Sequence, residues 1–183
     1  SSLTANITTA PLTITGVSAS NKVYDGTTSA TLTGTAAYSG LQNGETFSVT
    51  GTASASFASA AVGTGKGVTV TGYTAPSSNY SITQPSSLTA NITAKALTIA
   101  SASASNKTYD GTNAATITGT LSGIVGSDVV TLSPSGTFAQ TGIGTGIVVT
   151  STSTLGGGGA GNYTLTQPSS LTANITAKAL TIA

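Results

Sequence analysis

Hydrophobic and polar residues alternate along most of the chain. Single Val, Ile or Leu residues stand between Thr and Ser residues, as in Leu12 to Thr15 and Val68 to Thr71. A period of two with many β-branched residues is typical of strands that have one buried and one exposed face. No segment shows a helical period, and the density of Gly and β-branched residues disfavours helices. The pattern therefore predicts an all-β fold.

Turn-forming Gly, Pro and Asn residues divide this pattern into short strands. Their spacing of about 8 to 12 residues is typical of an antiparallel, Ig-like β-sandwich. In the first half of the chain the predicted strands are Leu12 to Ser18, Ser29 to Gly34, Thr46 to Thr50, Ala53 to Ser59, Gly67 to Tyr73, Tyr80 to Thr83 and Leu88 to Thr93.

An internal repeat organises the chain. Residues 83–100 recur without change as residues 166–183, a displacement of 83 positions, and residues 1–8 repeat the middle of the same segment. Self-similarity at a fixed period is the signature of repeat architectures. The sequence thus predicts tandem antiparallel β-sandwich repeats of about 83 residues.

The repeat also predicts the domain boundaries. We expect one repeat at residues 10–93 and a second at 94–176. Residues 1–9 would be the last strand of a preceding repeat, and residues 177–183 the first strand of a following one, in a longer array. Because each repeat has few large apolar side chains, we expect neighbouring repeats of the same chain to stabilise it, and identical chains to associate laterally.

The composition excludes several classes of function. Charged residues make up 5% of the chain and the net charge is +1, against about 25% charged residues in an ordinary domain. Without a basic patch, nucleic acid is a poor partner, and no apolar stretch is long enough to span a membrane. The chain lacks Cys, Met, His and Trp, which excludes disulfides, thiol nucleophiles and imidazole metal ligands. We therefore expect no cofactor and no metal.

Two polar motifs occur once in each repeat and form the candidate site. In the first repeat they consist of Lys22, Tyr24, Asp25, Gly26, Thr27, Asn79 and Tyr80, and in the second of Lys107, Tyr109, Asp110, Gly111, Thr112, Asn162 and Tyr163. A carboxylate beside a phenol can do acid–base chemistry, but neither a second carboxylate nor a His accompanies it. We interpret Asp-Gly as a turn and Asn-Tyr as a turn followed by a core anchor, and predict that the protein is not an enzyme.

Other possibilities remain open for these polar residues. Lys22 or Lys107 could form an intramolecular Lys–Asn cross-link if Asp25 or Asp110 supplied the required carboxyl group. Several Asn residues lie in N-x-Ser/Thr sequons, so glycosylation is a further possibility. Glu45 and Asp128 stand alone in the sequence, too few for a Ca²⁺ site.

The combination of Lys-x-Tyr-Asp-Gly-Thr, a later Phe57 and Val62-Gly63, and the closing Asn-Tyr resembles the YDG/MBG repeats of large bacterial exoproteins of the filamentous-haemagglutinin and two-partner-secretion type. The resemblance implies a secreted or surface-anchored, stalk-like region at the bacterial cell surface, of the kind that extends an adhesin or builds biofilm matrix. Ala94 and Ala177 stand where that family often has proline, so the link between repeats could continue as an unbroken strand.

These observations lead to two hypotheses about function. The first is a structural stalk or filament segment of an extracellular adhesin that supplies length and stiffness. The alternative is a binding module in which Thr-rich faces or Tyr-bearing loops recognise surface glycans, mucin or ice. A binding module should bind saturably as an isolated unit, whereas a stalk segment should not.

Overall fold

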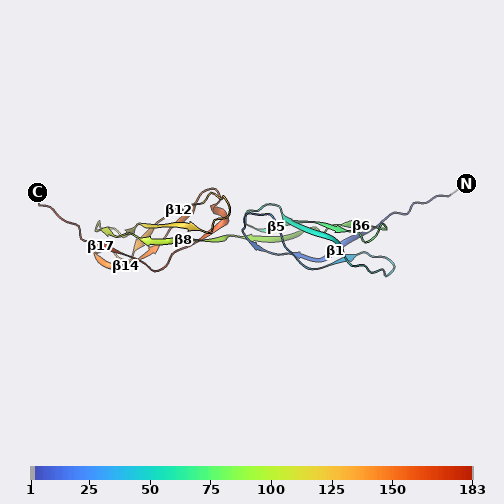
Figure 1. The fold of residues 1–183 in the computed structure, drawn as a ribbon, viewed down its shortest axis with the longest axis horizontal. Helices are drawn as coiled ribbons and strands as arrows, with labels where there is room; N and C mark the ends of the chain where they lie inside the picture. The colour runs from blue at the N-terminus through green and yellow to red at the C-terminus, as the bar shows by residue number, and fades with distance from the viewer. Residues whose placement is uncertain (1–2, 183) are drawn as a thin grey trace. The chain divides into compact units, whose positions relative to one another are not determined.

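The computed structural model describes residues 3–182. The chain divides into two compact units, Ser1–Thr93 and Ala94–Ala183 (Figure 1). Throughout residues 3–182, every regular element except the 3₁₀ turn η1 (Ala160–Asn162) is a strand. The all-β fold class with two tandem units is therefore confirmed.

Within residues 3–93, seven strands form two sheets. The first sheet has the order β3-β1-β6 and contains β1 (Ala10–Ala19), β3 (Leu32–Ser39) and β6 (Tyr80–Thr83). The second has the order β2-β7-β5-β4 and contains β2 (Lys22–Val23), β4 (Thr50–Phe57), β5 (Gly63–Thr74) and β7 (Leu88–Thr93).

Residues 94–182 repeat this arrangement with more and shorter strands. The sheet β11-β8-β16 contains β8 (Lys95–Ala104), β11 (Ile117–Ser122) and β16 (Tyr163–Thr166). The sheet β10-β13-β14-β17-β9 contains β9 (Lys107–Thr108), β10 (Ala114–Ala115), β13 (Gly136–Phe138), β14 (Gly144–Ser151) and β17 (Leu171–Thr176). A separate pair consists of β12 (Thr131–Ser133) and β15 (Thr154–Gly156).

The sheets are mixed, whereas the strand spacing predicted antiparallel pairing throughout. Strands β1 and β6 pair in parallel, as do β2 and β7, and the second unit repeats both pairings as β8 with β16 and β9 with β17. Parallel neighbours need a long crossover connection. The chain supplies it by passing through the opposite sheet before it returns beside an early strand, a path that strand spacing alone does not specify.

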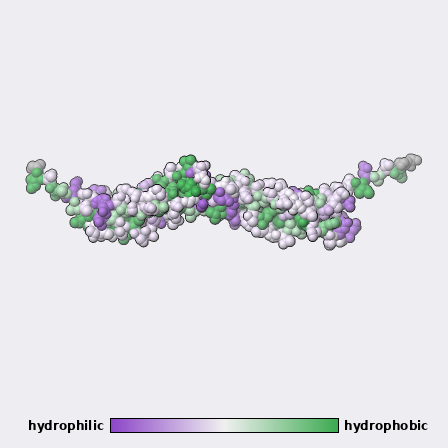
Figure 2. All heavy atoms as spheres, in the orientation of Figure 1, coloured by the Kyte–Doolittle hydropathy of each residue, from purple (hydrophilic) through white to green (hydrophobic). Residues whose placement is uncertain are grey.

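The alternating pattern places apolar residues in one core within each unit. In β1, Leu12 and Ile14 are buried, and Leu97 and Ile99 repeat them in β8. The second unit's core cluster combines residues from both of its larger sheets: Ala115, Ile117, Phe138, Ile147, Val149, Leu171, Ala173 and Ile175. The intervening Thr and Ser side chains face solvent, so the visible surface is largely pale, with hydropathy near zero (Figure 2).

The predicted strand limits hold best beside the repeated motifs. The strands Tyr80–Thr83 and Leu88–Thr93 have the predicted bounds. The predicted strand at Thr46 to Thr50 is wrong, because β4 begins only at Thr50. The residues before it form a loop that is held by side-chain contacts rather than by a ladder.

The chain ends and the link between units also differ from an extended strand. Residues 3–9 and 177–182 form no strand, and residues 1, 2 and 183 of the two predicted flanking strands lie outside the described residues. Ala94 separates β7 from β8, so the predicted continuous strand is interrupted at this residue. The assignment of both ends to neighbouring repeats stays a prediction.

One hairpin is built differently in the two units. In the first unit the whole of β4 pairs with the second half of β5, from Val68 to Thr74, with one irregularity between Gly51 and Ser54. In the second unit the same hairpin is divided into β13–β14 and β12–β15. Pro134 lies between β12 and β13. Because proline has no backbone N–H to donate to a ladder, it accounts for the interruption.

Candidate functional site

The Lys-x-Tyr-Asp-Gly-Thr motif of the first unit forms a compact hydrogen-bonded group. The Lys22 ammonium donates to Asp25 Oδ1 at 2.7 Å, to the Thr27 carbonyl oxygen at 2.8 Å and to Thr27 Oγ1 at 3.0 Å. The backbone N–H and hydroxyl of Thr27 both donate to Asp25 Oδ1 at 2.9 Å. All three protons of the ammonium therefore have an acceptor. We call this group the lysine clamp.

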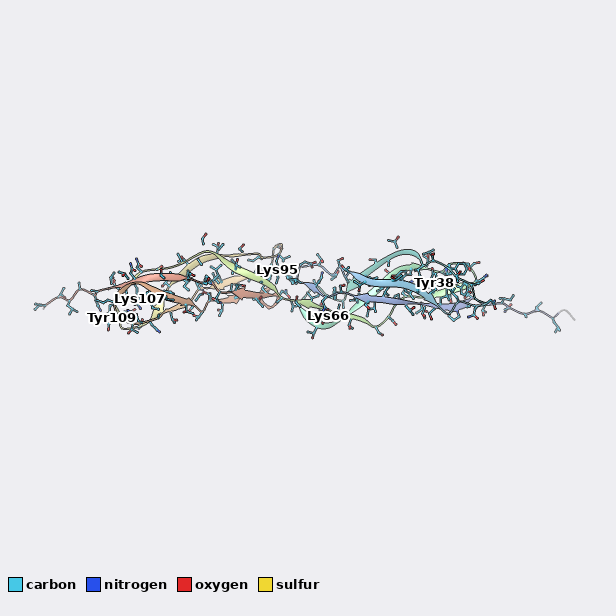
Figure 3. The ribbon with its side chains drawn as sticks, turned by 90° about the horizontal axis from the view of Figure 1, so that it is seen from below. Tyr38, Lys66, Lys95, Lys107 and Tyr109 are labelled. Atoms are coloured by element: carbon cyan, nitrogen blue, oxygen red, sulfur yellow. The ribbon has the colours of Figure 1, made fainter. Side chains whose placement is uncertain are left out.

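The second unit contains the same lysine clamp. Lys107 Nζ lies 2.7 Å from Asp110 Oδ1 and donates to the Thr112 carbonyl and hydroxyl oxygens at 2.9 and 3.0 Å. Each ammonium also lies over a core ring, at 5.6 Å from the Phe57 centroid and 5.8 Å from the Phe138 centroid. Such cation–π contacts stabilise a partly buried ammonium. Figure 3 shows Lys107 beside Tyr109 in the second unit.

The clamp fixes the protonation state of its carboxylate. The hydrogen bond from Lys22 and the backbone N–H of Thr27 lower the pKa of Asp25 from 3.8 to about 2. Lys107 and Thr112 lower the pKa of Asp110 in the same way, also to about 2. Both carboxylates are thus ionised at neutral pH, which suits an ion pair and not a general acid.

The Asn residues beside the clamp have other partners. Asn21 Oδ1 accepts the Asn91 backbone N–H at 2.7 Å, and Asn91 Oδ1 accepts the Gly65 N–H at 2.8 Å. Asn106 and Asn174 repeat these contacts in the second unit. The clamp ammoniums bond to Asp and Thr, so the geometry favours a noncovalent clamp over a Lys–Asn cross-link.

The remaining motif residues fulfil turn and packing roles, with one difference between the units. Gly26 and Gly111 have φ of 78° and 79°, the left-handed conformation expected for an Asp-Gly turn. Tyr24 is buried, with 6% of its surface exposed, whereas its counterpart Tyr109 is 43% exposed. The sequence-based expectation that this Tyr packs its ring therefore holds in the first unit only.

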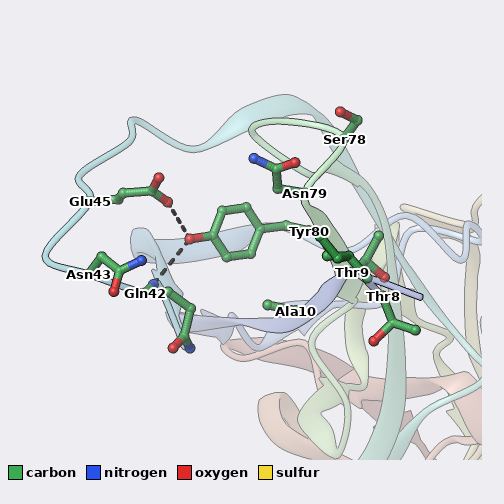
Figure 4. Close-up of a pocket in the computed structure, with 10 residues that line it drawn as sticks. Thr8, Thr9, Ala10, Gln42, Asn43, Glu45, Ser78, Asn79 and Tyr80 are labelled. Atoms are coloured by element: carbon green, nitrogen blue, oxygen red, sulfur yellow. Dashed lines mark hydrogen bonds between the residues drawn. The ribbon is translucent and has the colours of Figure 1, made fainter. Parts of the chain in front are cut away.

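The Asn-Tyr motif forms the second polar cluster that recurs in each unit, and the hydroxyl of its Tyr hydrogen-bonds to a loop. The Tyr80 hydroxyl donates to Glu45 Oε2 and accepts the Gln42 backbone N–H at 3.1 Å (Figure 4). In the second unit the Tyr163 hydroxyl donates to Asp128 Oδ2 at 2.6 Å and accepts the Val125 N–H at 2.9 Å. Both rings are buried, which agrees with their predicted role as core anchors.

Sequence reasoning missed the two carboxylates of this cluster, because Glu45 and Asp128 appeared isolated. Each precedes its Tyr by 35 positions, so alignment of the repeats contained the signal. The hydrogen bond from Tyr80 to Glu45 is the main reason that the pKa of Tyr80 is raised above 10. For Tyr163, desolvation by burial raises the pKa most, followed by its bond to Asp128.

A glutamine contact was also missed. Gln84 accepts the Tyr73 backbone N–H at 3.2 Å and donates to the Tyr73 carbonyl at 2.7 Å, so its amide acts as a substitute ladder partner for β5. Gln167, its repeat counterpart, accepts the Ser151 hydroxyl and donates to the Ser153 carbonyl. Gln84 follows β6 and Gln167 follows β16. Each Gln thereby links the segment after a strand of one sheet to the chain of another sheet.

The first unit has a polar pocket of about 250 Å³ beside Tyr80 (Figure 4). Its lining residues are Ile7, Thr8, Thr9, Ala10, Gln42, Asn43, Glu45, Ser78, Asn79 and Tyr80. Hydroxyl, amide and carboxylate groups provide both donors and acceptors for hydrogen bonds, and the lining contains no cationic side chain. The pocket is therefore suited chemically to a small neutral, hydroxyl-bearing ligand.

Across residues 3–182, no three side chains of His, Cys, Asp or Glu are grouped as a metal site would require. The same residues contain no helix with the length and hydrophobicity of a membrane span.

The family model of the YDG domain matches the sequence twice, over residues 8–88 and 93–171. These ranges follow the two structural units and include both lysine clamps and both Asn-Tyr motifs. No curated protein and no solved structure gives a significant match. Since the two matches together cover most of the residues, the chain belongs to the YDG domain family and contains two tandem copies of the domain.

Proposed function

We propose that the chain is a structural segment of a stalk or filament in an extracellular bacterial surface protein, where tandem YDG domains supply length and mechanical stability. The proposal rests on the contacts that the recurring polar residues make. The lysine clamps and the Tyr–carboxylate pairs make their contacts inside their own unit. The residues that recur in both units thus stabilise the fold of each unit. This is expected of a domain that is repeated for its structure.

The surface of each unit supports the same proposal. Thr and Ser side chains occupy the outward positions of the strands, as Thr13 and Thr98 do at the centre of matching three-stranded sheets. Uncharged hydroxyl faces keep strands hydrated without a specific charge pattern. A polar face of this kind suits a segment that occurs many times in a secreted array, at the bacterial surface or in its matrix.

Single-molecule pulling tests the mechanical role. When the chain is stretched between two handles, each unit should unfold as one event. An 83-residue repeat should release about 280 Å of chain, from about 3.4 Å per extended residue. Two force peaks with equal increments are expected. A featureless extension, in which neither unit resists force, would contradict a load-bearing stalk.

A second candidate function, glycan binding, is favoured by the pocket beside Tyr80. Its carboxylate, amide and hydroxyl groups match the alternating donors and acceptors of a sugar. Nuclear magnetic resonance titration of the whole chain with neutral monosaccharides tests this candidate. Saturable shifts confined to the pocket residues, and lost in Asn79→Ala, would support it. Glu45→Gln serves as a variant that keeps the size of the side chain while removing its charge.

A further inference from the structure

The loop that carries Glu45 contains a chemical feature found nowhere else in the sequence. Nine Asn residues occur, and Asn43 alone is followed by Gly; the others precede Ile, Lys, Tyr or Ala. A side chain after Asn shields the next backbone nitrogen, and glycine has none. Asn43-Gly44 is therefore the one position in this sequence where that nitrogen is sterically open to the Asn amide.

The local structure keeps this dipeptide accessible. The Gln42 carbonyl accepts the Glu45 N–H at 2.9 Å, which closes a turn with Asn43 and Gly44 at its two central positions. Their φ values are 51° and 72°, as in a type I′ turn. Both residues are exposed, and no heavy atom lies within 4 Å of the position that a Gly44 Cβ would occupy.

The turn also leaves the reacting nitrogen available. In a four-residue turn the N–H of the third residue is not part of the closing hydrogen bond. Among the hydrogen bonds of residues 3–182, none involves the Gly44 N–H or the Asn43 side-chain amide. Neither the nucleophile nor the electrophile is therefore restrained by a partner.

We propose that Asn43 is a site of spontaneous deamidation that converts the loop to an Asp or isoaspartyl form. The Gly44 nitrogen loses its proton and attacks Asn43 Cγ, so that a nitrogen–carbon bond forms and a cyclic imide results. The Cγ–Nδ2 bond breaks, and ammonia leaves with the proton. Water then opens the imide at either carbonyl, which yields aspartate or, with the backbone rerouted through the side chain, isoaspartate.

The two Asp-Gly turns of the lysine clamps show how the same reaction is suppressed. Asp25 and Asp110 precede Gly26 and Gly111 and could form the same imide. Their carboxylates are ionised and held by a Lys and a Thr, and an ionised carboxylate resists nucleophilic attack. Asn43 has neither protection.

Deamidation would change the pocket beside Tyr80. Asn43 and Glu45 both line it, so conversion places a second carboxylate next to the first. The net charge of the chain falls from +1 to zero. The second unit has Gly126 and Ser127 at the corresponding positions before Asp128, so the change affects the first unit only.

The test is incubation of the intact folded chain at mildly alkaline pH and 37 °C, beside a synthetic peptide of residues 41–47. Peptide mapping by mass spectrometry locates each exchange of an amide NH₂ for a hydroxyl, and circular dichroism verifies that the chain stays folded. We expect conversion at Asn43 ahead of the other eight Asn residues. Retention of Asn43 after the peptide has reacted completely, or earlier conversion elsewhere, overturns the proposal.

Gly44→Ala is the matched variant. The added methyl group shields the backbone nitrogen and meets no neighbouring atom, but the left-handed φ of 72° makes any side chain at this position locally strained. Conversion of Asn43 should slow several-fold in this variant. Because this strain falls on an exposed turn outside every strand, the circular dichroism spectrum should still show the folded chain. Equal conversion rates in the two proteins would exclude the imide route.

Discussion

The two units share their lysine clamp but differ in one hairpin, which is β4–β5 in the first unit. The ammonium-to-carboxylate distance is 2.7 Å in both units, and each ammonium lies over an equivalent Phe ring. The outer hairpin is continuous in the first unit and divided at Pro134 in the second. The contacts of the lysine clamp are thus repeated with little change, whereas the pairing of the hairpin strands differs between the units.

The divided hairpin needs a replacement for the lost ladder. Ser151 and Ser153 are buried, and Ser153 Oγ accepts the Ser135 N–H at 3.1 Å and donates to the Ser135 carbonyl at 3.2 Å. In the first unit the position of Ser151 is held by the apolar, buried Val70. The backbone groups of this region are therefore hydrogen-bonded in two ways. The first unit uses a longer strand ladder, and the second uses buried Ser hydroxyls.

Truncation of the clamp's Phe should have the largest effect in either unit. Phe57→Ala and Phe138→Ala each remove a buried ring and its contact with the ammonium, which should cost about 3–5 kcal/mol. Urea unfolding followed by circular dichroism should separate into two transitions, with only the altered unit destabilised. A single transition that shifts as a whole would show that the units do not unfold independently.

Loss of a buried hydroxyl should matter in the second unit. Ser153→Ala removes the acceptor of the Ser135 N–H and one partner of the buried Ser151 hydroxyl, and each of these two hydrogen bonds contributes about 0.5–1.5 kcal/mol. The unfolding free energy from urea titration measures the loss. Thr150→Ala, at an exposed position of β14, is the control and should change stability little. Equal effects of the two substitutions would contradict a buried hydroxyl network.

Removal of the Tyr hydroxyl should weaken the loop in both units by a smaller amount. Tyr80→Phe and Tyr163→Phe delete the bonds to Glu45 and Asp128, which should lower the free energy of unfolding by less than Ser153→Ala does. Both Tyr pKa values are raised above 10 in the folded chain, so this contribution is complete below pH 10 and is lost as the pH rises through the raised pKa. The Phe variants should show less alkaline destabilisation, and phenolate absorbance should report late titration in the parent chain.

The acid dependence of the clamps should be the smallest effect, because about half of each carboxylate side chain is exposed. The pKa of Asp25 and Asp110 is lowered to about 2 from 3.8. Their contribution is therefore complete above pH 3.8 and is lost as the pH falls towards 2. Asp25→Asn and Asp110→Asn should reduce the pH dependence of the melting temperature in this window. If the melting temperature of the double variant depends on pH as in the parent chain, the clamps do not cause that dependence.

The sequence allows prediction of the parts of the fold that depend on local chemistry. The period of two predicts strands such as Leu88–Thr93, and the Asp25-Gly26 dipeptide predicts a turn with positive φ. The proximity of Lys22 to Asp25 follows from that turn. These inferences need only neighbouring residues, which is why they hold in both units.

Contacts between distant segments could not be predicted in the same way. The Tyr80–Glu45 bond joins residues 35 positions apart, and Gln84 substitutes for a strand partner of Tyr73. Both depend on which segments the parallel crossovers bring together, and the alternating pattern does not encode the partner of a strand. The effect of Pro134 on the hairpin likewise became visible only when the two units were compared.

The hydroxyl-covered strands have a consequence for the environments in which the domain can work. Threonine and serine do not titrate in water, and their hydrogen bonds are not screened by ions as charge pairs are. The outer faces therefore keep one chemical character when the pH changes. A chain built in this way should retain its surface properties from low to high salt and through moderate shifts of pH.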